Sequence, residues 1–108
     1  MSKFDDFTKG VMQGAEDLAK TTLEGFVNDA RTDSQAYLDK AKADLERWTQ
    51  ELAKQKLTQA EFTDLVRGQA ALAQMHALTT AGIALARVQQ FRDGLIDLVI
   101  DTAFKTFL

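Results

Sequence analysis

An eleven-residue repeat in the first half of the chain constrains the fold more than any other feature. Counted from Phe4, the first position of successive repeats reads Phe4, Ala15, Phe26, Tyr37 and Trp48. Eleven residues make three helical turns at about 3.67 residues per turn, close to the natural period of the α-helix. The first position therefore stays on one side of a helix, and the positions beside it add alanine, leucine and methionine. The pattern predicts an amphipathic helix with an apolar stripe over residues 4–52.

The stripe is weakest at residues 28–35, where only Ala30 is apolar. Asp33 or Ser34 could cap a new helix there, because aspartate and serine favour the N-cap position. The phase of the repeat is nevertheless the same before and after this segment, which favours one helix. Two helices that meet at residues 31–34 are the alternative.

A complete helix-start signal lies near the middle of the chain, in the segment LTQAEF. Thr58 and Glu61 form a capping box, and Leu57 and Phe62 form the hydrophobic staple that often accompanies it. The chain contains no proline, and few other signals interrupt it. We therefore predict an all-α fold, a single helical domain over residues 1–108, with an antiparallel hairpin of two long helices at about 4–56 and 59–107.

Glycines at positions 68, 82 and 94 are the only breakers in the second arm. In a hairpin, Gly82 would lie opposite the weak segment near residue 31. Folding both arms there gives a second possible fold, a compact single-chain four-helix bundle with breaks near 31–34 and 82. Gly10 and Gly14 form a GxxxG pattern, which in so charged a segment marks a close helix contact or has no consequence.

The two arms differ in polarity, and this difference predicts association. The C-terminal stretch is apolar around more than half of its circumference, which is more than one partner helix with a single apolar stripe can cover. Leaving such a face in water would forfeit about 1.5–3 kcal/mol for each large side chain. We therefore expect a homo-oligomer, formed as a four-helix bundle or a larger helical assembly. The expected interface consists of Leu95, Ile96, Val99, Ile100, Ala103, Phe104 and Phe107.

The sequence offers little material for catalysis or for binding a cofactor or metal. It has no cysteine and a single histidine, His76, whose neighbours are apolar or carry hydroxyls, so a core-facing or seam histidine bonded to a hydroxyl or carbonyl is expected. Asp93, Asp97 and Asp101 share one helix face, but a solvated stripe fits them better than a metal site, because no Glu-x-x-His pair accompanies them. We expect no enzyme activity, no cofactor and no metal.

The net charge of −3 argues against nucleic acid as a partner. The absence of cysteine and of an N-terminal apolar run favours the cytoplasm. Residues 68–86 carry no charged side chain. Their glutamines, threonines and histidine nevertheless favour a buried helix over a membrane span.

The repeats, best seen in AEDLAKTTLEG, resemble in period and composition those of exchangeable apolipoproteins and desiccation-protection proteins, over residues 4–58. This resemblance implies a protein that binds lipid or other hydrophobic surfaces, although the net acidity disfavours anionic membranes. Two functions therefore stay open. The first is a non-enzymatic helical self-assembly or interaction protein with a structural or scaffold role, and the second is an amphipathic surface binder.

Overall fold

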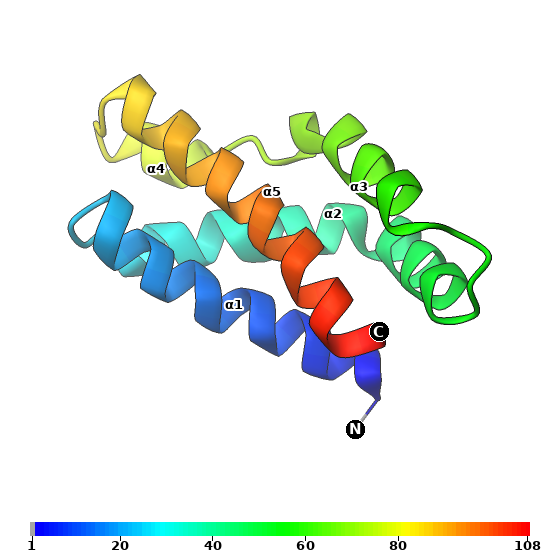
Figure 1. Cartoon of the computed structure of the whole chain (residues 1–108). Helices are drawn as coiled ribbons and strands as arrows, with labels where there is room; N and C mark the ends of the chain where they lie inside the picture. The colour runs from blue at the N-terminus through cyan, green and yellow to red at the C-terminus, as the bar shows by residue number, and fades with distance from the viewer. Residues whose placement is uncertain (1) are drawn as a thin grey trace.

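The computed structural model describes residues 2–108 and is built from helices, with no strand among those residues. They fold into a body with principal dimensions of 42 × 27 × 21 Å. The predicted all-α class is confirmed. In chain order the elements are α1 (Lys3–Thr22), α2 (Val27–Ala53), α3 (Gln59–Gly68), a 3₁₀ turn (Ala70–Leu72), α4 (His76–Thr80) and α5 (Leu85–Phe107) (Figure 1).

The first predicted arm, residues 4–56, is not one helix, and its break lies at residues 23–26 instead of 31–34. Glu24, Gly25 and Phe26 all have positive φ angles, of 55°, 133° and 53°. Three successive residues in this region reverse the chain within a few residues, and only glycine adopts it without steric cost. The repeat keeps its phase across the turn because α1 and α2 bury the same apolar positions in one core.

The weak segment at 28–35 is continuous helix, although both expected capping residues do lie there. Asp33 and Ser34 are buried within α2 and do not begin a helix of their own. The carboxylate of Asp33 instead accepts hydrogen bonds from the backbone amides of Ala77 and Leu78, each at 2.9 Å. The sequence signal for a cap was therefore real, but it acts on α4, which is distant in sequence.

The capping box at the start of α3 is confirmed. The Thr58 hydroxyl accepts from the Glu61 amide at 3.1 Å, and the Glu61 carboxylate accepts from the Thr58 amide at 2.9 Å. These bonds lower the pKa of Glu61 below its usual value. Phe62 is fully buried behind the cap, as the staple requires.

The second predicted arm, residues 59–107, is also interrupted. After α3 the chain passes through the 3₁₀ turn and α4, with positive φ angles at Met75 (56°) and Gly82 (84°), before α5 begins. The predicted break near Gly82 is thus present, whereas the two long arms are not. The fold corresponds most closely to the compact single-chain bundle, because the turns let the short α3 and α4 fold back over α2 and α5 (Figure 1).

Helices α1 and α5 pack closely through glycines. A Cβ atom built on Gly14 would lie 2.6 Å from Leu98 Cδ1, and one built on Gly94 would lie 2.8 Å from Leu18 Cδ2. Gly10 faces Thr102 in the same way, at 3.1 Å. The two helices therefore run antiparallel, with each leucine seated over a glycine of the other helix. Of the two alternatives left open for the Gly10 and Gly14 pattern, the structure has the close helix contact.

Candidate functional site

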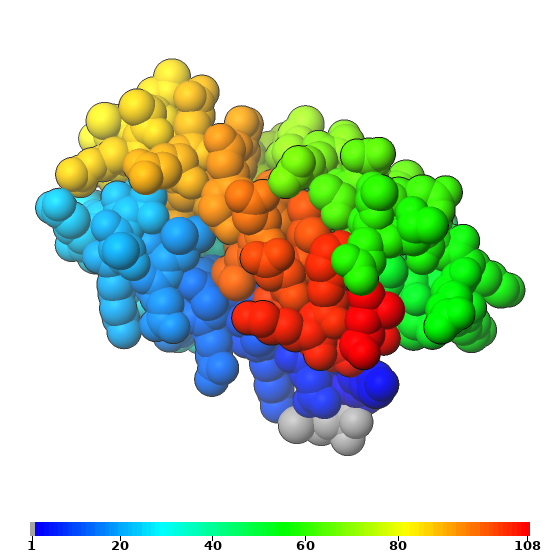
Figure 2. Space-filling model, in the orientation of Figure 1, coloured from blue at the N-terminus to red at the C-terminus, as the bar shows by residue number. Residues whose placement is uncertain are grey.

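The residues expected to form an oligomer interface are largely buried inside the folded chain itself. Five of them, Leu95, Ile96, Val99, Ile100 and Ala103, are at most 5% exposed. The rings of Phe104 and Phe107 are partly buried and contact Phe62 and Phe7, with centroids 5.9 Å apart in both pairs. The chain therefore covers the face that the sequence appeared unable to cover, because α1, α2 and α3 all pack on α5. Figure 2 shows α1 and α3 on either side of α5.

Two of the three aspartates of α5 form surface ion pairs. Asp97 lies 3.4 Å from Arg67, and Asp93 lies 3.5 Å from Arg92, with both aspartates well exposed. Across residues 2–108, no three histidine, cysteine, aspartate or glutamate side chains gather closely enough to hold a metal ion. His76 is exposed instead of facing the core, and its Nε2 lies 2.9 Å from the Gln74 side-chain carbonyl.

A polar cluster that the sequence did not reveal lies on the buried side of α2. Asp33 is 5% exposed, and its two bonds tie α2 to the first amides of α4. The Ser34 and Tyr37 hydroxyls are buried without a hydrogen-bond partner among the described residues. Burial raises the pKa of Tyr37 to about 12. The two bonds of Asp33 therefore hold the start of α4 against α2.

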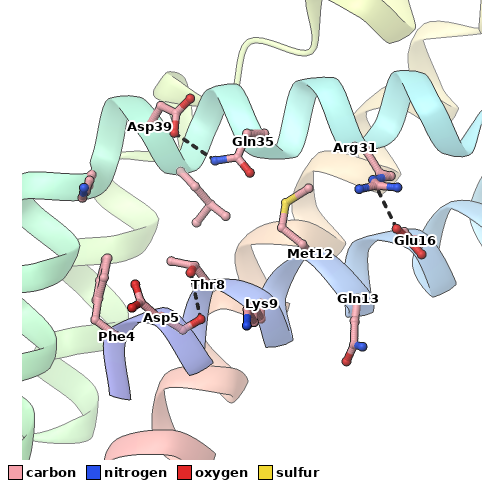
Figure 3. A pocket seen from close by; sticks show the side chains of 12 residues that line it. Phe4, Asp5, Thr8, Lys9, Met12, Gln13, Glu16, Arg31, Gln35 and Asp39 are labelled. Atoms are coloured by element: carbon pink, nitrogen blue, oxygen red, sulfur yellow. Dashed lines mark hydrogen bonds and ion pairs between the residues drawn. The ribbon is translucent and has the colours of Figure 1, made fainter. Parts of the chain in front are cut away.

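An open groove of about 410 Å³ lies on the surface between α1 and α2. We call it the α1–α2 groove. Three apolar side chains line its base: Phe4 and Met12 are partly buried, and Leu38 is buried. Figure 3 shows Phe4 and Met12 on α1 facing α2 across the groove, and Gln35 on the opposite wall.

Charged side chains line both walls of the groove, and one ion pair crosses it. Arg31 Nε on α2 lies 3.2 Å from Glu16 Oε1 on α1 (Figure 3). The helices are antiparallel, so residues early in α1 lie opposite residues late in this part of α2. Along the groove, α1 presents Asp5, Lys9 and Glu16, and α2 presents Lys42, Asp39 and Arg31. At each of these three positions along the groove, one wall is therefore acidic and the other is basic.

A second surface feature lies at the end of the molecule where α1 turns into α2. Phe26 is 49% exposed, and Leu85, at the start of α5, is 67% exposed. The Arg87–Glu24 ion pair, at 3.5 Å, holds the start of α5 beside this turn. Phe26 is also one of the residues with a positive φ angle. A strained backbone that leaves a large apolar ring in water is unusual.

Comparison of the chain with family models, with curated proteins and with solved structures finds no match. Among residues 2–108, none of the helices combines the length and the hydrophobicity needed to cross a bilayer.

Proposed function

We propose that the protein is a non-enzymatic helical interaction protein, with a structural or scaffold role, that binds a protein partner through the α1–α2 groove. The observation that carries this proposal is the composition of the groove, which has an apolar base between two charged walls. Stable protein interfaces combine an apolar centre with a polar rim. Amphipathic helices are commonly recognised in grooves of this kind.

The walls of the groove are fixed by the core, which supports a recognition role. Val11 and Ala15 on α1, and Ala41 and Leu45 on α2, are at most 1% exposed on the faces turned away from solvent. Close packing of these residues holds the two helices at a fixed spacing. A partner that binds here meets a preformed surface, and ordering that surface on binding has little entropic cost.

The shape of the groove favours an extended partner over a small molecule. Small-molecule pockets enclose most of the ligand surface and carry a few converging polar groups. The α1–α2 groove is instead an open trough whose polar groups lie along its two edges, from Asp5 to Glu16 on α1 and from Arg31 to Lys42 on α2. Such an arrangement suits a partner helix or helix pair laid along it.

The exposed Phe26 and Leu85 support a second candidate function, binding to a lipid surface. Large apolar side chains at one end of a protein can insert into the interface of a bilayer. The stripe of the eleven-residue repeat is less suited to this role, because Ala15, Tyr37 and Trp48 are buried in the core. Cosedimentation with phosphatidylcholine vesicles, compared between wild type and Phe26→Ser, tests this candidate.

Site-specific photo-crosslinking tests the interaction proposal. Benzoylphenylalanine is placed at Gln35, which lines the groove, or at Asp64, which is exposed on α3 and serves as the control. We expect one defined protein to be captured from Gln35 and not from Asp64. We also expect Met12→Asp to abolish the capture while circular dichroism shows that the variant keeps its helix content. Equal yields at both positions, or capture that survives Met12→Asp, would refute the proposal.

A further inference from the structure

The charges along the α1–α2 groove identify the kind of partner that fits it. We infer that the partner is a second copy of this chain, docked groove to groove about a two-fold axis that runs along the groove. This inference rests on the proposed function, since it names the partner of the same surface. Two-fold dimers are the commonest protein oligomers, and each protomer contributes the same patch to their interface.

The two walls of the groove carry opposite orders of charge. From one end of the groove to the other, α1 carries acidic, basic and acidic residues, and α2 carries basic, acidic and basic residues. In that order they are Asp5, Lys9 and Glu16 on α1, and Lys42, Asp39 and Arg31 on α2. The side chains of Arg31 and Lys42 are 55% and 65% exposed, and that of Glu16 is 33% exposed, so a partner can reach them.

A half-turn about an axis along the groove exchanges the two walls and leaves each residue at the same position along the groove. Helix α1 of one protomer then lies over α2 of its partner. Asp5 faces Lys42 of the partner subunit, and Glu16 faces Arg31 of the partner subunit. Each of these contacts occurs twice, once on either side of the axis. All facing charges along the walls are opposite in sign, which favours association and fixes its register.

The other face-to-face arrangement, with the two-fold axis across the groove, produces the reverse pattern. In that case each helix lies over its own copy, and the two ends of the groove exchange. Asp5 then faces Glu16 of the partner subunit, and Lys42 faces Arg31 of the partner subunit. Like charges in contact disfavour this arrangement. The charge order on this chain therefore selects one of the two possible face-to-face dimers.

The packing of helices is also favourable in the selected arrangement. Since α1 and α2 are antiparallel within a protomer, α1 of one copy is antiparallel to α2 of the other. The four helices form a bundle in which every neighbouring pair is antiparallel, a common and stable geometry. Phe4 and Met12, which are only partly buried in the protomer, lie along the centre of this bundle and lose their remaining contact with water.

A charge-swap experiment tests the inference. Asp5→Lys and Lys42→Asp are each made alone, and dimer dissociation constants are measured by sedimentation equilibrium at low salt. Each substitution places two like-charge contacts in the homodimer, so we expect dissociation constants at least about tenfold higher than that of wild type. In an equimolar mixture of the two variants, every one of these contacts becomes opposite in sign. We therefore expect the heterodimer, and also the double variant Asp5→Lys/Lys42→Asp, to recover affinity to within about threefold of wild type.

Matched controls separate the groove from general charge effects. Asp64→Lys and Lys56→Asp change exposed charges on α3 and in the turn before it, and neither residue lines the groove. We expect both to leave the dissociation constant unchanged. Thermal melts show whether each single variant is folded, and the recovery on mixing reports on contact between protomers even if a variant is less stable.

The inference is overturned by a wild-type chain that stays monomeric at every concentration, or by single variants that dimerise as wild type does. Failure to recover affinity on mixing would also overturn it. The proposed function fails separately, in the crosslinking experiment. Capture of a different protein from Gln35 by a monomeric chain would uphold the proposed function and reject the second copy as its partner.

Discussion

The close approach of α1 and α5 predicts opposite effects for the same substitution at two glycines. Replacing glycine by alanine inside a helix stabilises it by about 1 kcal/mol, because alanine has the higher helix propensity. At Gly68 nothing lies within 4 Å of the added Cβ, so Gly68→Ala should raise the free energy of unfolding. Because Gly68 is the last residue of α3, we expect a gain of about 0.5 kcal/mol.

At Gly14 the same substitution meets Leu98. The added Cβ would lie 2.6 and 2.7 Å from the two Leu98 Cδ atoms and 3.1 Å from its Cγ, so the whole end of the leucine side chain must move. Overpacking of this kind costs about 1–3 kcal/mol. After subtracting the propensity gain, Gly14→Ala should lower the free energy of unfolding by about 1 kcal/mol.

Urea denaturation followed by circular dichroism measures both effects, and a double-mutant cycle isolates the contact. In a Leu98→Ala background the obstruction is gone, so Gly14→Ala should become stabilising by about 1 kcal/mol. The reasoning is refuted if Gly14→Ala stabilises the wild-type chain as Gly68→Ala does, since α1 and α5 would then not pack as described.

Three further predictions concern the buried polar cluster and the cap of α3. Asp33→Ala removes the two hydrogen bonds from the amides of Ala77 and Leu78, so it should lower the free energy of unfolding by about 2–4 kcal/mol. It should also speed amide hydrogen exchange at Leu78, and unchanged exchange there would contradict this role of Asp33. Tyr37 has a folded-state pKa of about 12, above its unfolded value of 10.0, so its contribution to stability is complete below pH 10 and is lost as the pH rises to 12. The free energy of unfolding should fall by about 3 kcal/mol over this range, as measured by urea denaturation at each pH. Tyr37→Phe should not show this loss. An equal alkaline loss in both proteins would exclude Tyr37 as its source. Thr58→Ala should cost about 1 kcal/mol in the same assay, and an unchanged midpoint would show that the capping box does not stabilise α3.

The sequence predicted the local features of the fold that depend on neighbouring residues. The capping box at Thr58, the helical class and the glycine contact at Gly14 follow from short patterns and are present. The break near Gly82 was also predicted, as an alternative. These features were accessible because caps, helix propensity and small-residue contacts act over a few residues.

The turn at residues 23–26 could not be predicted in the same way. Its signal is Gly25 alone, and the two non-glycine residues beside it, Glu24 and Phe26, take up unfavourable φ angles that no local preference suggests. Packing of α1 against α5 holds the turn, and that packing depends on residues far apart in sequence. The unbroken eleven-residue phase concealed the turn, because two antiparallel helices that share a core can keep the same pattern.

The candidate site was missed for a related reason. The α1–α2 groove exists only because the chain turns at residues 23–26, and a single long helix would have no such groove. The sequence reasoning instead placed the interface on α5, from Leu95 to Phe107, because in a two-armed hairpin that helix has only one neighbour. In the folded chain α5 has several neighbours, and Phe4 and Met12 in the groove are among the apolar side chains that stay only partly buried.

Hydrogen exchange of the α5 amides as a function of protein concentration tests the central claim most directly, with the mass of the species followed by sedimentation. If one chain covers its own C-terminal helix, the amides from Leu95 to Ala103 stay protected by the same factor when dilution converts dimers to monomers. If their protection instead falls with the dimer population, then a second molecule covers α5, and the account of a self-sufficient protomer that associates through the α1–α2 groove is wrong.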